Sequence, residues 1–274
     1  MVASCPNCGT ELVYNHEATT WGCVKCGNTF ERSQVEDTLP DGKHRRRDKD
    51  DYPTPAPLAK WAVDRAWELK TPMLSRPHNL FVLEPGCGDR APFARAAALR
   101  GEDPAAVGSN VTSIDIRARG ELPSDAEPVE DYAREHGINN LAVHRGVDFL
   151  DVKRVVDLVG EAVYIRGFDV IATNPPYNLA EDFIRHALAM LHPTGVAVFL
   201  LRLSFMSTQG RIPLFRDRPP AEVHVLHKRP SFVNGKTDNS EYGFFLWTGE
   251  TLDAVRRSEG RQHARLFWID NREW

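Results

Sequence analysis

The sequence has no hydrophobic run close to the roughly 18 apolar residues that a transmembrane helix requires. Its first residues also lack the basic segment followed by an apolar one that is typical of a signal peptide. Positive charge is not in excess, because 34 Lys and Arg stand against 38 Asp and Glu, for a net charge of −4. We therefore expect a cytoplasmic protein without a membrane partner, and a nucleic-acid partner would have to meet local basic patches.

Cysteine is scarce, yet four of the five cysteines form two Cys-x-x-Cys pairs separated by fourteen residues. The pairs are Cys5 with Cys8 and Cys23 with Cys26. A glycine follows each pair, as expected where the chain turns back so that N–H groups reach the thiolates. Such spacing, in a chain expected to be cytoplasmic, favours a four-cysteine structural Zn²⁺ site over disulfides. With four thiols available, His16 is interpreted as a hairpin side chain.

The chain divides by composition into three parts: a zinc ribbon at 1–32, a linker at 33–57 and a main domain at 58–274. The linker is charged and proline-rich, with few large apolar residues. Its basic run His44–Arg47 is followed at once by acidic residues, which favours a solvated linker over a nucleic-acid-binding arm.

From residue 58 onward, β-rich runs alternate with segments of helical periodicity, which predicts an α/β domain with a doubly wound, seven-stranded Rossmann-like sheet. The predicted strands are 79–83, 111–116, 141–145, 168–173, 195–203, 222–227 and 242–247. The predicted helices are 58–69, 92–100, 129–136, 152–159, 179–191 and, with a weaker pattern, 211–216.

A glycine-rich turn and three acidic positions follow successive strands. Glu84-Pro85-Gly86-Cys87-Gly88-Asp89 comes after the first strand and would let a nucleotide approach the backbone. A pyrophosphate is disfavoured there, because Glu84 and Asp89 would repel it. Asp115 closes the second strand, where it can accept hydrogen bonds from ribose hydroxyls, and Asp148-Phe149 follows the third, where an acid and a ring suit an adenine.

The corner Asn174-Pro175-Pro176-Tyr177 ends the largely apolar strand at 168–173. An amino group on a base is a poor nucleophile, because its lone pair is delocalised into the ring. The side-chain oxygen of Asn174 and the carbonyl of Pro175 could accept its two hydrogens, which frees the lone pair to attack. Tyr177 could stack on the ring and position it.

Taken in order, these motifs resemble class I S-adenosylmethionine-dependent methyltransferases, and the corner resembles the branch that methylates amino groups. Thr54-Pro55 is similar to the segment that precedes the sheet in DNA adenine-N6 methyltransferases, and the C-terminal part looks like small, phage-type enzymes with a gamma-like motif order. The resemblance implies S-adenosylmethionine as cofactor. It also implies a cofactor site formed by Thr54, Glu84, Pro85, Gly86, Gly88, Asp115, Ile116, Asp148 and Phe149.

The resemblance implies methyl transfer to adenine N6 in DNA, with Asn174, Pro175, Pro176 and Tyr177 as catalytic corner and Phe232 as a second aromatic wall for a flipped base. Two alternatives stay open: methylation of an RNA base or of a protein glutamine, and a non-catalytic nucleic-acid-binding protein. Cytosine also stays open as the target base, although enzymes that methylate its amino group more often carry serine where Asn174 stands. Only 97 residues follow Tyr177, too few for a large recognition domain in addition to the rest of the sheet. The oligomeric state and recognition sequence are not predicted.

Overall fold

The computed structural model describes residues 12–15, 20–23, 25, 28–30, 53–70, 80–100, 109–118, 128–230, 239–260 and 264–270. The chain forms two compact units, Met1–Lys49 and Asp50–Trp274. No helix within these described ranges is long and apolar enough to cross a membrane.

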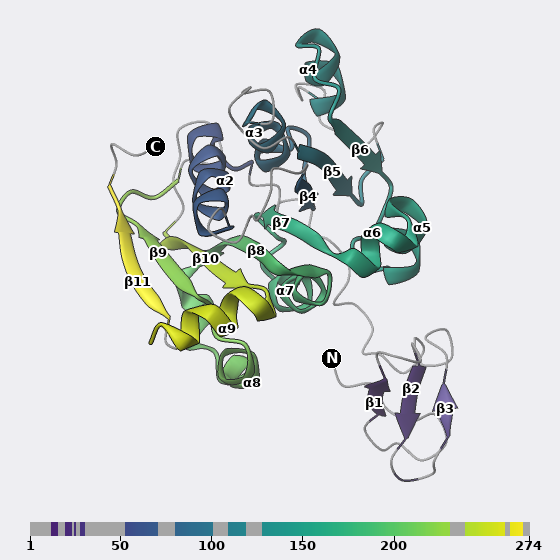
Figure 1. The fold of residues 1–274 in the computed structure, drawn as a ribbon, viewed down its shortest axis with the longest axis vertical. Helices are drawn as coiled ribbons and strands as arrows, with labels where there is room; N and C mark the ends of the chain where they lie inside the picture. The colour runs from purple at the N-terminus through teal and green to yellow at the C-terminus, as the bar shows by residue number, and fades with distance from the viewer. Residues whose placement is uncertain are drawn as a thin grey trace. The chain divides into compact units, whose positions relative to one another are not determined.

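The first unit contains a three-stranded antiparallel sheet in the order β1-β2-β3 (Figure 1). Its strands are β1 (Leu12–Asn15), β2 (Thr20–Cys23) and β3 (Thr29–Phe30). Cys23 closes β2 opposite Leu12, whereas Cys5, Cys8 and Cys26 lie outside the described residues. Among the residues that are described, no group of three His, Cys, Asp or Glu could hold a metal. The zinc site therefore stays a prediction.

The second unit is built on one mixed sheet in the order β11-β9-β10-β8-β7-β4-β5-β6 (Figure 1). Its strands are β4 (Leu80–Pro85), β5 (Ser109–Asp115), β6 (Leu141–Arg145), β7 (Phe168–Thr173), β8 (Leu191–Arg202), β9 (Glu222–Leu226), β10 (Tyr242–Thr248) and β11 (Arg265–Ile269). Only β10, among these strands, runs antiparallel to both neighbours. The α/β class is confirmed, but the prediction of seven strands is wrong, because β11 adds an eighth, parallel to β9.

The strand order reverses between β4 and β7. From β4 the chain steps outward through β5 to β6, and it then returns to place β7 on the other side of β4. All six residues of β7 are buried, as expected for a parallel strand covered on both faces. In open α/β sheets, ligands bind outside the carboxyl ends of the strands at such a reversal. The reversal therefore places a candidate site after Pro85 and Thr173.

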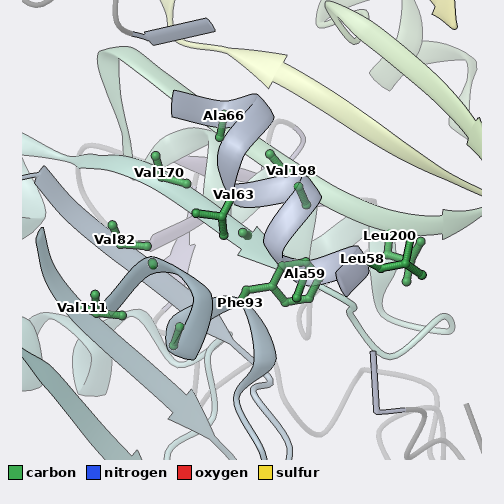
Figure 2. Packing of buried hydrophobic residues seen from close by; sticks show 14 of the residues in the cluster. Leu58, Ala59, Val63, Ala66, Val82, Phe93, Val111, Val170, Val198 and Leu200 are labelled. Atoms are coloured by element: carbon green, nitrogen blue, oxygen red, sulfur yellow. The ribbon is translucent and has the colours of Figure 1, made fainter. Parts of the chain in front are cut away.

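One face of the sheet is covered by α2 (Ala56–Lys70), α3 (Pro92–Arg100) and α4 (Val129–Glu135). Helix α2 buries Leu58, Ala59, Ala62, Val63 and Ala66, the spacing of one helical face. Figure 2 shows this packing, with Val63 beside Val82 and Val170 of the sheet and Ala59 beside the Phe93 ring of α3. Within this layer, α2 and α3 both begin at the carboxyl edge of the sheet.

The other face is covered by α5 (Val152–Val159), α6 (Glu161–Arg166), α7 (Ala180–Ala189) and α8 (Ile212–Asp217). Each of the six predicted helices agrees with an observed helix to within two residues at both ends. The sequence pattern missed α6 and α9 (Glu250–Ser258). Helix α6 is short and buries none of its residues, so it carries little periodic signal.

A buried ion cluster joins α2 to β9. Glu222 is 1% exposed, and its two carboxylate oxygens accept hydrogen bonds from Arg65 at 2.8 and 3.0 Å. His224 Nε2 lies 2.8 Å from the same carboxylate. Burial alone would raise the pKa of Glu222, but the hydrogen bonds from His224 and Arg65 outweigh it and lower the pKa to about 2. Glu222 is therefore a carboxylate throughout the neutral range.

Candidate active site

The carboxyl ends of β4 and β7 are fastened together at the strand reversal. The Thr173 hydroxyl donates a hydrogen bond of 2.5 Å to the Pro85 carbonyl, and Thr173 is fully buried. A Cβ placed on Gly86 would lie 3.9 Å from Cδ of Pro176 and 3.4 Å from the Phe183 ring. The glycine turn after β4 and the proline corner after β7 are thus direct neighbours. The two residues joined by that hydrogen bond lie 88 positions apart in the sequence.

The turn after β4 needs its two glycines. Gly86 and Gly88 both have φ of 66°, in the left-handed region that residues with a Cβ avoid. The Gly86 N–H donates to the Ile114 carbonyl of β5 at 2.7 Å. The backbone therefore turns tightly over the end of β5, and the absence of a Cβ at Gly86 lets the turn pack closely against Phe183 and Pro176.

Gly88 is held from two sides. Its N–H donates to the Asp115 carboxylate at 2.7 Å, and its carbonyl accepts from the Arg145 guanidinium. Arg145 also donates to the Asp89 carbonyl at 3.3 Å and pairs with both oxygens of Glu130 at 2.8 and 3.1 Å. Arg145 was not singled out from the sequence, because its role depends on contacts with residues about 56 positions away. These bonds preorganise the turn.

Glu84 lies beneath the turn and is 2% exposed. Its carboxylate accepts the N–H of Ala94 at 2.6 Å, in the first turn of α3. Burial raises the pKa of Glu84 well above its usual range, and the negative charge of Asp115 adds to this, although hydrogen bonds from Ala94 and Phe93 oppose it. In this structure the Glu84 carboxylate links the end of β4 to the first turn of α3.

The structure places Asp115 and Ile116 at the tip of β5, in contrasting positions. Asp115 is fully buried, and its carboxylate also accepts from the Arg117 N–H at 2.9 Å and from Arg117 Nε at 3.2 Å. In this arrangement its carboxylate braces the turn, and a direct contact with a ribose would require Arg117 to give way. Ile116 is 50% exposed. It offers an apolar surface at the same edge, suited to the face of a base.

Asp148 and Phe149 lie in different environments. The N–H of Val147, just before them, donates to the Asp115 carbonyl at 3.0 Å, so the loop after β6 adjoins the tip of β5. Asp148 is partly exposed, and its carboxylate accepts the Leu150 N–H at 2.9 Å. Phe149 is only 2% exposed, with its ring centroid 5.0 Å from that of Phe183. In this structure Phe149 belongs to the core and does not offer a ring face to a ligand.

Thr54 lies just before α2 and is 6% exposed. Within the part of the chain that is described, its Oγ1 is buried and has no hydrogen-bond partner. Buried hydroxyl groups are almost always hydrogen-bonded, so this atom is a candidate contact for a ligand. Its place at the carboxyl edge agrees with that role, because α2 begins there and ends with Lys70 paired to Asp169 near the start of β7.

In the corner itself, Pro175 is buried, whereas Asn174, Pro176 and Tyr177 are partly exposed. The Tyr177 ring meets two residues that sequence reasoning did not assign to the corner. The Arg202 guanidinium lies 4.6 Å from the ring centroid, and the Tyr242 ring lies 5.9 Å away at an angle of 45°. Phe232, the predicted second wall, lies outside the described residues.

Comparison with known proteins identifies the fold of the chain but no relative by sequence. No protein-family profile matches the chain, and no curated protein matches its sequence. A class I S-adenosylmethionine-dependent methyltransferase from Listeria monocytogenes, so described, superposes with a TM-score of 0.54 and 11% identity over 80% of this chain and 67% of that chain. The chain therefore has the Rossmann-like fold of class I S-adenosylmethionine-dependent methyltransferases.

Two further structures are similar at lower scores. The M protein of the type I restriction enzyme EcoKI gives a TM-score of 0.47 and 15% identity over 81% of this chain and 48% of that chain. A protein from Pyrococcus horikoshii, described as an RNA methyltransferase, gives 0.48 and 13% identity over 75% and 91%. The chain spans about half the length of the EcoKI protein.

Proposed function

We propose that this protein is an S-adenosylmethionine-dependent N-methyltransferase that acts on the N6 amino group of adenine in DNA. One observation carries the proposal. The turn at Gly86 and the corner at Asn174–Tyr177 are neighbours at the strand reversal, held by the bond from Thr173 to Pro85. A methyl donor bound against the turn would thus lie beside an amide, a carbonyl and an aromatic ring, which are the groups that an amino acceptor requires.

The described residues fit S-adenosylmethionine. Gly86 and Gly88 carry no Cβ at the turn, which would allow a ligand to approach its backbone, and the acid Glu84 closes β4 directly before this turn. The buried Oγ1 of Thr54, which has no partner among the described residues, is available to the same end. Ile116 and the Asp148 carboxylate would meet the adenine face and its amine. When bound, this cofactor supplies an electrophilic methyl group on a sulfonium.

The corner performs the rest of the chemistry. The Asn174 side-chain oxygen and the Pro175 carbonyl accept the two N–H bonds of the target amine, which draws its nitrogen toward tetrahedral geometry and localises the lone pair. Neither proline carries an N–H that would compete for that lone pair. Tyr177 holds the ring flat by stacking. The N–C bond would form as the bond from the methyl carbon to the cofactor's sulfur breaks, leaving a neutral thioether, and the nitrogen would lose one proton to solvent. No residue of the chain is covalently modified.

DNA adenine is preferred as substrate because the corner begins with Asn and because Thr54 precedes α2 at the carboxyl edge. A base in a duplex must leave the stack to reach the corner. The segment after β8 offers a surface for nucleic acid beside the corner. There, Met206 and Ile212 are 44% and 56% exposed, and Arg211 between them is held by the Phe205 carbonyl and the Thr208 hydroxyl.

We also propose that the N-terminal unit binds one structural Zn²⁺ through its four paired cysteines. The support is the donor set and the antiparallel sheet, in which β2 ends at Cys23. A unit of this size has little core of its own, so the metal would supply much of its folding free energy. The zinc would be structural, because four thiolates leave no open coordination position.

The function is tested by incubating the full chain with S-adenosylmethionine labelled in the methyl group. Duplex DNA, single-stranded DNA, RNA and a protein extract are offered separately, and the products are hydrolysed and analysed. The proposal expects label in N6-methyladenine from DNA. Label in an RNA base or in glutamine would contradict the DNA assignment and retain the amino chemistry. Label in none of the four pools, from protein that binds the cofactor, would contradict the enzymatic proposal.

A further inference from the structure

Arg202, the last residue of β8, lies over the ring of the corner's tyrosine. Its guanidinium carbon is 4.6 Å from the Tyr177 ring centroid, within the range of a cation–π contact. The two residues lie 25 positions apart in the sequence and come together because β7 and β8 are parallel neighbours whose carboxyl ends meet. The ring that we assign to base stacking is therefore contacted by the end of the next strand.

The position of Arg202 is itself fixed by β10. Tyr242 is the first residue of β10 and stands directly opposite Arg202 in the antiparallel register. Arg202 Nε donates a hydrogen bond of 3.3 Å to the Tyr242 hydroxyl, and Tyr242 is 1% exposed. The Tyr242 ring also packs near that of Tyr177, 5.9 Å between centroids. Tyr177 in the turn after β7, Arg202 at the end of β8 and Tyr242 at the start of β10 thus form one cluster, in which Tyr242 is the most deeply buried member.

This cluster requires an arginine. A guanidinium is planar and can stack on a ring while its Nε donates sideways, whereas the ammonium of lysine is a point charge that cannot make both contacts with the same geometry. Arg202 therefore restrains the plane of the Tyr177 ring through its shape as well as through its charge.

We propose that Arg202 is a positioning residue for methyl transfer, which sets the plane of Tyr177 and with it the plane of any base stacked there. This inference rests on the proposed function of the corner. A small error in the plane of the base moves the amino nitrogen away from the line of attack, and misplacements of about 1 Å cost roughly a hundredfold in rate. Arg202 would act on kcat/KM without touching the cofactor.

The test compares Arg202→Lys with wild type and with Arg265→Lys in the full chain. Arg265 is a matched control, because its guanidinium lies 4.7 Å over the Phe267 ring on β11, four strands from β7 in the sheet. All proteins are labelled with 3-fluorotyrosine, and the Tyr177 resonance is assigned with Tyr177→Phe. Fluorine spectra then report the ring's surroundings, while calorimetry reports cofactor affinity and labelled methyl transfer reports kcat/KM.

We expect Arg202→Lys to move the Tyr177 resonance and to lower kcat/KM roughly tenfold or more, with cofactor affinity unchanged. Arg265→Lys should do neither. Tyr242→Phe, which removes only the hydroxyl that accepts from Arg202, should move the Tyr177 resonance in the same direction and lower kcat/KM by a smaller factor.

The outcomes separate the two proposals. Wild-type rates in Arg202→Lys would overturn the positioning role and leave the proposed function intact. A Tyr177 resonance that does not move would overturn it as well, because the ring's plane would not depend on Arg202. A wild type that binds the cofactor and methylates no nucleic acid would overturn the proposed function first, and the positioning role with it.

Discussion

Replacement of Asp115 by Asn should weaken both the fold and cofactor binding, since its carboxylate braces the glycine turn. The carboxylate accepts hydrogen bonds from the N–H of Gly88 at 2.7 Å and from the N–H and Nε of Arg117 at 2.9 and 3.2 Å. An amide of the same shape has one oxygen. If that oxygen faces Arg117, the amide NH₂ meets the N–H of Gly88, so one charge-assisted bond is lost and two donors face each other.

The expected loss of stability follows from the hydrogen bonds that the substitution removes. A hydrogen bond to a charged group contributes about 1.5 to 3 kcal/mol, and a buried donor left without an acceptor costs about 1 to 3 kcal/mol. Because part of the second cost is relieved by a shift of the turn, we expect a loss of about 2 to 3 kcal/mol in the free energy of unfolding. The shift displaces Gly88, so S-adenosylmethionine should also bind at least about tenfold more weakly, equivalent to about 1.4 kcal/mol.

Urea titration measures the stability, and isothermal calorimetry measures the cofactor affinity. The control is Asp151→Asn, another Asp-to-Asn change, at the N-cap of α5, where the carboxylate accepts the Arg154 N–H at 3.2 Å. Asn caps helices as well as Asp, so this variant should behave as wild type in both assays. A stable Asp115→Asn with unchanged affinity would refute the bracing role. Lost stability with unchanged affinity would refute the link between the turn and the cofactor.

Three other measurements test separate parts of the account. Glu222→Gln should lose the part of the acid dependence of stability that Glu222 contributes, because its lowered pKa of about 2 means that wild type loses on the order of 3 kcal/mol from this group as the pH falls from about 4.5 toward 2. Urea titrations at pH 7 and pH 3 would contradict this if both proteins changed equally. Gly86→Ala and Gly137→Ala, with φ of 66° and 67°, should each cost about 1 to 2 kcal/mol in urea, but only Gly86→Ala should weaken cofactor binding in calorimetry. Metal analysis of freshly purified protein should give one zinc per chain, with Zn–S distances of about 2.3 Å by X-ray absorption, and a metal-free protein would remove the zinc proposal.

The elements that the sequence predicts well are those with a strong local pattern. Strand β7 is apolar and fully buried along its whole length, and α2 repeats its apolar residues on one face. Strand β11 was missed although residues 266–269 form an apolar run, because a run of only four residues cannot by periodicity alone be assigned to a strand.

The sequence predicts only those parts of the site whose role depends on the type of a residue and on its position along the chain. The positive φ of Gly86 and Gly88 and the place of the corner after β7 follow from turn chemistry and strand order. The brace from Arg145 and the contact from Arg202 could not be predicted, because each depends on strand register and on the direction of a long side chain. Phe149 shows the same limit, since an aromatic residue beside an acid suits both a ligand and the core.

The central claim is that the corner after β7 activates an amino group, and Asn174→Ala tests it most directly. Methyl transfer by this variant is measured on the nucleic acid that wild type labels best, with cofactor affinity measured in parallel by calorimetry. The account predicts unchanged cofactor affinity and a loss of transfer of about a hundredfold or more, as for removal of one preorganised transition-state contact. A folded Asn174→Ala protein that methylates adenine at the wild-type rate would contradict it.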